Sequence, residues 1–280
     1  MCTSVWFYLT MSCVNPDQPH SEQNDATSGE APGWVIAIGG GRRTDTLMFH
    51  IIRYCRLQPG DTVWIAPMAS EEPDSAYWYV ALDFQRMGLI PKPYVFYTLQ
   101  DYYPPDTARV KLVFFTGGDQ NRLMQSLSLA NVLDDLKLYR LSGGHIAGTS
   151  AGAAVMSEYM ITGNQWKHPD YEATFSRLIA DNVEIVSGAG LLSSCIIDQH
   201  FITRSRYNRL ISALFELPML SGIGVEESSA IVTDDSIAVA IGSGQIVQIR
   251  AGTPKRRDDL IGFEDLIMHI HLPGDTFYLK

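Results

Sequence analysis

Residues Ile146 to Ala153 read I-A-G-T-S-A-G-A and contain the pentapeptide G-x-S-x-G, with Ser150 at its centre. An apolar run precedes the pentapeptide, and a helix-like run from Ala151 to Tyr159 follows it. This context predicts a sharp strand-to-helix turn that exposes one hydroxyl near a helix N-terminus, where unpaired N–H groups stabilise negative charge. The pentapeptide alone fits a tightly packed turn without chemistry equally well.

His200 is the best-placed base for such a serine. A serine hydroxyl is a weak nucleophile until a neighbouring base takes its proton, and the base is usually a histidine oriented by a carboxylate. Among seven histidines, His200 stands out because it follows a buried, strand-like run, Ile196 to Asp198, whose end turns polar. Sheet enzymes place their chemistry at strand ends, which favours His200, although a histidine that only forms hydrogen bonds at the core edge fits the same pattern.

Glu226 and Glu227 are the candidate acids. They follow an apolar run from Gly222 to Val225 that reads as a strand. Side chains alternate along a strand, so we expect the two carboxylates to point to opposite faces, and only one of them can orient His200. The alternative is a pair of surface acids at the end of a strand.

Three arginines, Arg204, Arg206 and Arg209, come shortly after His200 in a chain with only 21 Lys and Arg residues. Guanidinium groups bind carboxylates through paired hydrogen bonds, so the cluster predicts a pocket for a substrate carboxylate. A solvated helix face accounts for the same spacing.

These segments occur in an order that resembles one family. The order is Phe115 to Gln120, Gly148 to Gly152, Asp198 to Phe201 with the three arginines, and Gly222 to Glu227. Together they closely resemble the cyanophycinase and peptidase E family of serine exopeptidases, over about Trp34 to Arg250. The resemblance implies an α/β, flavodoxin-like fold related to class I glutamine amidotransferases, with a mostly parallel sheet and helices on both faces.

The resemblance also implies roles for individual residues. Ser150 is the nucleophile, His200 the base and Glu227, which the spacing favours over Glu226, the orienting acid. The backbone N–H groups of Gly118 and Ala151 hold the oxyanion. Residues implied around the substrate are Gln120, Asp198, Gln199, Arg204, Arg206 and Arg209. The implied partner is a peptide substrate, cyanophycin or another β-aspartyl peptide, and the family suggests a homodimer. Neither a metal nor an organic cofactor is implied.

Two departures from the family concern the pocket more than the catalytic residues. Glu226-Glu227 stands where cyanophycinases usually carry Asp-Glu. The segment between Ser150 and His200 is longer, with a loop that begins at Trp166. These departures leave the reaction type alone and leave the particular substrate open.

Two other functions remain as alternatives. An α/β-hydrolase esterase would pair Ser150 with Asp234 or Asp235 and with a late histidine, His269 or His271. That fold requires the order Ser, acid, His, whereas here the best-placed histidine precedes the best-placed acid. A non-catalytic relative that binds peptides is the second alternative. A glutamine amidotransferase is disfavoured because the turn holds serine rather than cysteine.

The elements that position these residues alternate between strands and helices, as in a parallel sheet covered on both faces. Strands are predicted over 34–38, 62–68, 94–99, 110–115 and 144–148, and helices over 44–56, 74–87, 120–128 and 129–141. Short strands follow at 184–190, 196–198, 222–225, 229–232, 237–241 and 245–250, with a helix over 205–217. No hinge divides residues 33–280, so we expect a single α/β peptidase domain.

Composition argues against several partners. The net charge is -10, the pI is near 5.1 and no basic stripe appears, so no nucleic-acid partner is expected. No apolar stretch is long enough to span a bilayer. The four cysteines lie far apart without C-x-x-C spacing, which indicates neither a zinc site nor a disulfide framework. Cys55 and Cys195 lie in apolar runs and are expected to be buried thiols.

Residues 1–32 read as a separate segment, either a disordered tail or a leader. Val5 to Val14 is apolar with a cysteine at position 13, and a polar stretch follows. The pattern fits a clipped signal peptide or a lipoprotein leader acylated at Cys13, although no Lys or Arg precedes the apolar part. We expect export or lipid anchoring; a tail on a cytoplasmic enzyme is the alternative.

Overall fold

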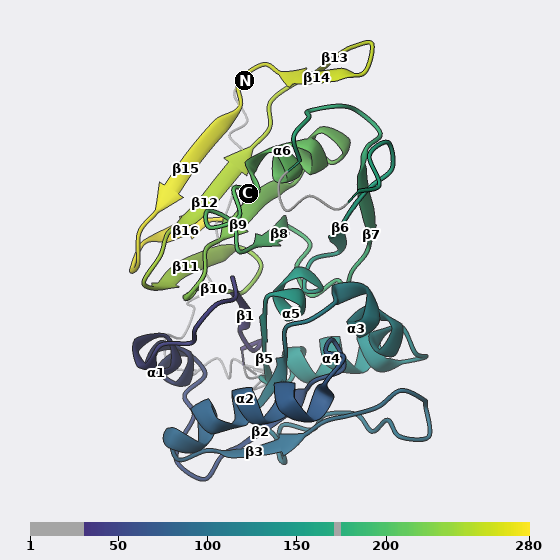
Figure 1. Ribbon diagram of the computed structural model, residues 1–280. Coiled ribbons are helices and arrows are strands. Elements are labelled where there is room, and N and C mark those ends of the chain that lie inside the picture. The colour runs from purple at the N-terminus through teal and green to yellow at the C-terminus, as the bar shows by residue number, and fades with distance from the viewer. Residues whose placement is uncertain (1–30, 171–174) are drawn as a thin grey trace, which may run out of the picture.

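The chain folds around an eight-stranded mixed sheet in the computed structural model, which describes residues 31–170 and 175–280 (Figure 1). Its parallel part contains β1 (Val35–Ile38), β5 (His145–Thr149), β4 (Leu112–Phe115), β2 (Thr62–Ala66) and β3 (Ile90–Pro93), in that spatial order. The antiparallel part continues from β1 through β10 (Ser229–Thr233) and β11 (Ile237–Gly242) to β16 (Thr276–Tyr278).

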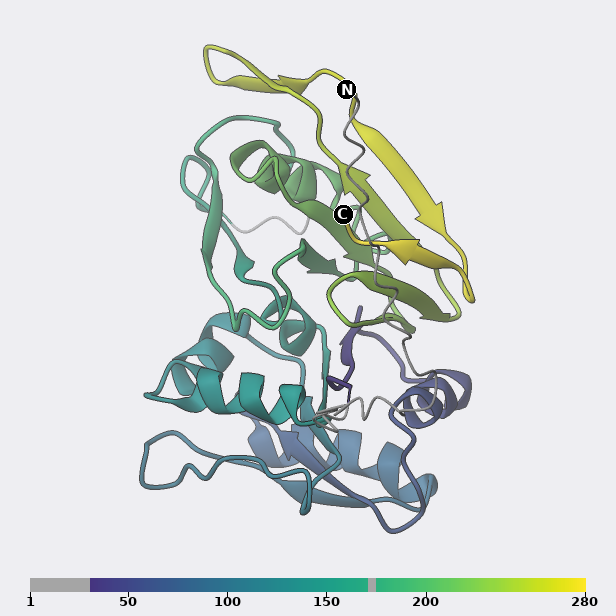
Figure 2. The ribbon, with the colours of Figure 1, turned by 180° about the vertical axis from the view of Figure 1, so that it is seen from behind.

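Helices cover both faces of this sheet (Figures 1 and 2). One face carries α1 (Asp45–Tyr54) and α2 (Pro73–Arg86), and the other carries α3 (Gln120–Leu127), α4 (Val132–Leu141) and α5 (Ala151–Ala154). Alternating side chains of the strands supply both cores: Val35 and Ala37 face one core, and Ile36 and Ile38 face the other. The predicted α/β sheet with helices on both faces is thus confirmed.

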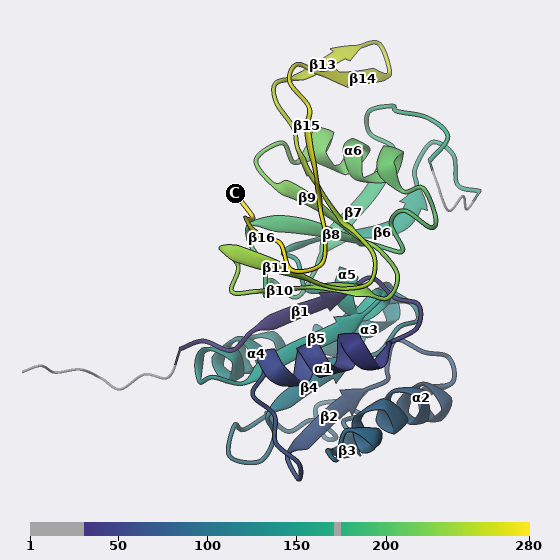
Figure 3. The same cartoon turned by 90° about the vertical axis from the view of Figure 1, so that its left-hand side faces the viewer.

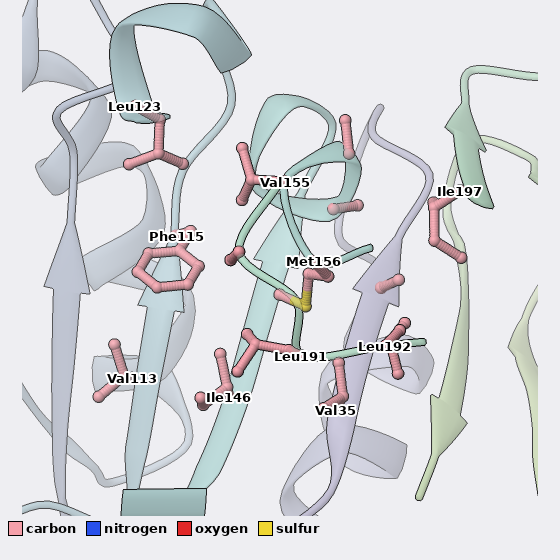
Figure 4. Close-up of a cluster of buried hydrophobic side chains, with 14 of the residues drawn as sticks. Val35, Val113, Phe115, Leu123, Ile146, Val155, Met156, Leu191, Leu192 and Ile197 are labelled. Carbon is pink, nitrogen blue, oxygen red and sulfur yellow. The ribbon is translucent and has the colours of Figure 1, made fainter. Parts of the chain in front are cut away.

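A second, four-stranded sheet lies next to the first (Figure 3). Its strands, in spatial order, are β15 (Ile267–His271), β12 (Ile246–Arg250), β9 (Ser221–Val225) and β8 (Cys195–Gln199). One face packs on α6 (Tyr207–Glu216), with Ile196 of β8 among the contacts. The other face shares the main-sheet core, and Figure 4 shows Ile197 beside the cluster that contains Val35 and Met156. The ends of β8 and β9 are therefore fixed relative to the main sheet.

Two small hairpin-like pairs complete the described elements. One pairs β6 (Tyr159–Gln165) with β7 (Val183–Ser187), and the other pairs β13 (Pro254–Arg257) with β14 (Leu260–Phe263). The sequence patterns predicted neither β6 nor any strand after residue 250.

The third strand lies earlier than predicted. β3 reads I-P-K-P, and the prediction of a strand over 94–99 is wrong. β3 is the outer strand of the sheet and pairs with β2 alone. Proline lacks an N–H and is tolerated at a sheet edge, where half of the backbone groups need no partner. Tyr94 and Phe96 are instead buried in the core without forming a strand.

The helix after the G-x-S-x-G turn is much shorter than the predicted run to Tyr159, because α5 ends at Ala154. The carbonyl of Val155 accepts a hydrogen bond from the backbone N–H of Ala189, and that of Met156 accepts hydrogen bonds from Leu191 and Leu192. Partners from far along the chain thus replace the next helical turn.

Except for residues 31 and 32, the predicted leader lies outside the described residues. Within 31–170 and 175–280, no helix is both long and apolar enough to cross a membrane. The same part of the chain contains no group of three or more His, Cys, Asp and Glu side chains that could hold a metal ion. Cys55 and Cys195 are buried free thiols, as predicted, and burial raises the pKa of both.

Candidate active site

Ser150 stands at the turn between β5 and α5, in an unusual backbone conformation. Its φ is 53° and its ψ is -111°, and its N–H donates to the carbonyl of Ile38 at 2.9 Å. Residues other than glycine adopt positive φ only where the surrounding structure imposes it. The small neighbours are required, because a Cβ at Gly148 would lie 2.3 Å from Gly152 O and one at Gly152 would lie 2.4 Å from Phe115 O. The hydroxyl is therefore carried at the carboxyl end of β5.

His200 and Glu227 complete a hydrogen-bonded chain that begins at the Ser150 hydroxyl. Ser150 Oγ lies 2.9 Å from His200 Nε2, and His200 Nδ1 lies 2.5 Å from Glu227 Oε1. The carboxylate favours the tautomer with its proton on Nδ1, so the Nε2 lone pair faces the serine. Such a chain can move a proton from the hydroxyl to the imidazole.

Burial lowers the pKa of His200 below its ordinary value of 6.5. The hydrogen bond to Glu227 acts in the opposite direction, whereas the positive charges of Arg204 and Arg206 lower the pKa further. The net shift is downward, which keeps the imidazole neutral at neutral pH. A neutral imidazole is the form that can accept a proton.

Glu226 contacts a different part of the same turn. Its carboxylate accepts hydrogen bonds from the backbone N–H of Ile202 at 2.6 Å and of Thr203 at 3.0 Å, and from the Thr203 hydroxyl. Both carboxylates lie beyond the end of β9, where strict alternation of side chains no longer applies. Rather than pointing to opposite faces, they both bind the turn that begins at His200, and Glu227 is the one that contacts the imidazole.

A glycine loop to which the sequence analysis gave no role lies against the histidine. Gly39, Gly40 and Gly41 follow β1, and Gly40 has a φ of 104°. A Cβ at Gly40 would lie 2.4 Å from His200 Nε2, and one at Gly41 would lie 2.8 Å from the Glu227 Cβ. The carbonyl of Gly39 accepts the His200 N–H at 2.7 Å. The signal was three consecutive glycines at the end of a predicted strand.

Gly118 and Ala151, the predicted oxyanion donors, follow the adjacent strands β4 and β5. The loop after β4 passes close to the nucleophile, since a Cβ at Gly117 would lie 3.4 Å from the Ser150 Cβ. Gly118 has a φ of 141°, and a Cβ there would lie 2.1 Å from Ala69 O, so only glycine fits. Ala151 begins α5, where a backbone N–H has no partner within the helix. Oxyanion binding by these groups stays a prediction.

The three arginines meet, but two of them bind partners inside the protein. Asp198 is buried and accepts hydrogen bonds from Arg209 Nε at 2.9 Å and from Arg206 Nη1 at 3.4 Å. Arg206 Nη1 also donates to the side chain of Gln199 at 2.6 Å. Arg204 is exposed, and its guanidinium has no hydrogen bond or ion pair with any residue that the structure describes. Arg204 is therefore the arginine best able to face a substrate carboxylate.

The three arginines and Gln199 line a cleft of about 250 Å³. This cleft, which we name the arginine cleft, reaches Ser150. Its lining consists of Gly118, Asp119, Gln120, Asn121, Ser150, Thr162, Gly163, Asn164, Gln199, Arg204, Arg206 and Arg209. Gln120 fixes one wall, because its amide donates to the carbonyls of Ile161 at 3.1 Å and Thr162 at 2.7 Å. The structure thus gathers the predicted substrate residues in one cleft, with Asp198 holding two of the arginines.

The groups named for the esterase alternative have other partners. Asp235 accepts hydrogen bonds from the backbone N–H of Ser193 at 3.0 Å and from its hydroxyl at 2.7 Å. His271 stacks on Phe277 with ring centroids 3.8 Å apart, and His269 stacks on His271.

Comparison with known proteins agrees with this geometry. The model of peptidase family S51 matches residues 35–241. A cyanophycinase from Trichormus variabilis is 32% identical over 232 residues, which cover 78% of this chain and 75% of that protein. A cyanophycinase from Synechococcus elongatus is 29% identical over 279 residues, which cover 94% of this chain and 84% of that protein.

Solved structures show the same fold. A peptidase from an acI-B1 actinobacterium superposes with a TM-score of 0.65 at 18% identity, covering 89% of this chain and 98% of the other. A putative peptidase E from Listeria monocytogenes superposes with a TM-score of 0.52 at 15% identity, covering 76% of this chain and 99% of the other. The fold is thus shared with a peptidase E, as the resemblance implied. This chain belongs to peptidase family S51 and is a serine peptidase similar to the cyanophycinases.

Proposed function

We propose that this protein is an exopeptidase that hydrolyses aspartyl or β-aspartyl peptide bonds by acyl transfer through Ser150, His200 and Glu227. The observation that carries the proposal is the hydrogen-bonded chain, with 2.9 Å between Ser150 Oγ and His200 Nε2 and 2.5 Å between His200 Nδ1 and Glu227 Oε1. These are distances at which a base can take the proton of a nucleophile. Membership of a peptidase family supports the same reaction class.

In the first half of the reaction, Ser150 Oγ attacks the scissile carbonyl carbon while its proton passes to His200 Nε2. Glu227 stays ionised and stabilises the imidazolium. The N–H groups of Gly118 and Ala151 bind the oxyanion, and each such donor is typically worth about 10²- to 10³-fold in kcat. The C–N bond then breaks, the proton moves from Nε2 to the leaving amine, and an acyl ester remains on Ser150.

In the second half, water attacks the ester while His200 Nε2 takes one of its protons. The carbon–oxygen bond to Ser150 breaks, the proton returns to Oγ, and the free acid leaves. The lowered pKa of His200 supports both proton transfers, because the imidazole starts each half in its neutral form.

The arginine cleft supports an acidic residue on the acyl side of the scissile bond. Arg204 provides a guanidinium at the cleft, and Arg206 and Arg209 keep the surroundings positive even though Asp198 binds both. The relatives named cyanophycinases make cyanophycin and β-aspartyl peptides the first substrates to test.

The test is hydrolysis of cyanophycin, β-aspartyl dipeptides and α-aspartyl dipeptides by the purified protein, with Ser150→Ala and His200→Ala alongside. We expect at least one of these peptides to be cleaved and each variant to lose at least about 10³-fold in kcat. A fluorophosphonate probe should label wild-type Ser150. Turnover of nitrophenyl esters alone, surviving in His200→Ala, would favour the esterase alternative. A folded protein that neither cleaves peptides nor reacts with the probe would be a non-catalytic binder.

A further inference from the structure

Two pockets reach Ser150, one from each face of the main sheet. The arginine cleft includes residues at the start of α3. The other pocket, which we name the α2 pocket, has a volume of about 250 Å³ and is lined by Ala76, Tyr79 and Val80 of α2 and by turn glycines next to Ser150. The helices α2 and α3 pack on opposite faces of the sheet (Figure 1). The two pockets that they line therefore lie on opposite sides of the nucleophile.

We propose that the α2 pocket is the subsite for the leaving residue of the substrate and that it accepts an uncharged apolar or aromatic side chain. The inference rests on the proposed function, in which the acidic acyl side of the scissile bond occupies the arginine cleft. The two sides of a peptide bond extend in opposite directions from the carbonyl carbon that Ser150 attacks. With the acyl side held at Arg204, the leaving residue extends toward α2.

The walls of the α2 pocket suit an apolar side chain. Val80 is buried, Ala76 is half-buried, and the exposed Tyr79 provides an aromatic ring. Gly117 leaves room beside the nucleophile, since a Cβ there would contact Ser150 at 3.4 Å from its Cβ and 3.9 Å from its Oγ. Pockets of this kind bind apolar groups because they remove apolar surface from water.

The charges behind this pocket disfavour a cationic side chain. Arg43 lines the pocket, is buried, and donates from Nε to Asp83 at 2.7 Å. Arg86 binds the same carboxylate at 2.5 Å, so two guanidinium groups share one negative charge. The Arg43 guanidinium also lies 4.7 Å from the centre of the Tyr79 ring. One face of the ring is therefore already occupied by a cation. A further arginine or lysine meets like charge here, whereas leucine or phenylalanine does not.

The first test compares leaving residues. The substrates are aspartyl-leucine, aspartyl-phenylalanine, aspartyl-arginine and aspartyl-glycine, in whichever linkage the enzyme cleaves. We expect kcat/KM for the leucine and phenylalanine substrates to exceed that for the arginine substrate by about 10-fold or more. Equal values, or a preference for arginine, would overturn the proposal while leaving the proposed function in place.

The second test changes the pocket itself. Ala76→Phe fills it, and the ratio of kcat/KM for aspartyl-leucine to that for aspartyl-glycine should fall by about 10-fold. Ser75→Phe is the matched control, because Ser75 is the preceding, exposed residue of α2 and lies outside the pocket. Tyr79→Ala removes the exposed aromatic wall of the pocket and should weaken the preference for leucine over arginine; Trp78→Ala, at another exposed residue of α2, is its control. If the pocket variants lost kcat/KM equally on all substrates, the α2 pocket would not be a subsite for the side chain of the leaving residue.

A third measurement separates this inference from the proposed function. Free leucine or phenylalanine should slow fluorophosphonate labelling of Ser150 in the wild-type enzyme more than free arginine does, and Ala76→Phe should remove that protection. If no aspartyl peptide is cleaved, the proposed substrate class is wrong, and the protection pattern alone then decides whether the α2 pocket binds apolar side chains. Equal protection by arginine and leucine would reject it.

Discussion

At His200, opposing influences on one pKa predict how activity changes with pH. Burial and the charges of Arg204 and Arg206 lower this pKa, Glu227 raises it, and the net shift is downward from 6.5. We therefore expect kcat/KM to be maintained at pH 6.5 and to fall only at lower pH, as His200 takes up a proton through its lowered pKa. The unfolded chain binds that proton more readily, so the free energy of unfolding also decreases as the pH falls from 6.5 toward the lowered pKa of His200. An acid limb centred above pH 6.5 in the kcat/KM profile would contradict this assignment.

Arg204 connects substrate binding to the same titration. Replacing it with methionine removes a positive charge that lowers the pKa of His200, so the pKa rises and the acid limb of kcat/KM moves to higher pH. KM for an aspartyl peptide should rise as well, because in the proposed function the exposed guanidinium binds the substrate carboxylate. Arg204→Lys keeps the charge and should leave the acid limb near its wild-type position. A limb that stays in place in Arg204→Met would show that this charge does not act on the imidazole.

Glu227 is expected to contribute mainly to kcat, and Glu226 mainly to stability. Glu227→Gln removes the carboxylate that orients His200 and should lower kcat by about 10⁴-fold with little change in KM. Glu226→Gln weakens the acceptor for the backbone N–H groups of Ile202 and Thr203, which should lower the free energy of unfolding by about 1 kcal/mol. Its kcat should stay within about 10-fold of the wild type. Steady-state kinetics and urea unfolding of both variants check this, and the opposite ranking would reverse the assignment.

Between elements, the loop after β1 supports the catalytic groups by close contact. Gly40→Ala places a Cβ 2.4 Å from His200 Nε2, which must displace the imidazole and should lower kcat by about 10²-fold. Gly60→Ala is a matched control, because Gly60 also has a positive φ, 93°, but nothing lies within 4 Å of an added Cβ. Both variants should lose roughly 1 kcal/mol of stability from the strained backbone, and only Gly40→Ala should lose activity. Equal kinetics in the two would mean that the loop does not position His200.

The sequence predicted most elements of the parallel sheet, and its failures have local causes. Short apolar runs located β1, β2 and β4, because these strands are buried on both faces, and helical spacing located the helices between them, which bury one face. The strand predicted at 94–99 is an irregular buried segment, whereas the real β3 carries two prolines that a local rule rejects. The helix does not continue past Ala154, because the next carbonyls, those of Val155 and Met156, bind backbone N–H groups of Ala189, Leu191 and Leu192, and such long-range partners leave no mark on a local pattern.

Across the whole molecule, the candidate catalytic groups come from two sheets. Ser150 and Gly118 follow strands of the main sheet, whereas His200 and Glu227 follow β8 and β9 of the second (Figure 3). The order of four motifs was enough to predict which residues meet, since the resemblance carries their spatial arrangement with it. It was not enough to predict the second sheet. The predicted strands 196–198, 222–225 and 245–250 form that sheet only through their pairing, and β15, which pairs with β12 at its edge, was not predicted.

Because the site bridges two sheets, the core between them should control activity separately from stability. Ile197 of β8 is buried in the core shared with the main sheet (Figure 4), and its neighbour Ile196 is buried on the other face, against α6. Either substitution by alanine should cost about 2–5 kcal/mol in the free energy of unfolding, because each leaves a cavity of similar size. Only Ile197→Ala loosens the contact that holds His200 over Ser150, so only this variant should lose kcat at temperatures well below its own unfolding midpoint. Urea unfolding measures the loss of stability, and kcat is compared at a fixed number of degrees below the unfolding midpoint of each variant. Equal losses of kcat in the two variants would mean that the shared core does not set the distance between the Ser150 hydroxyl and the His200 imidazole.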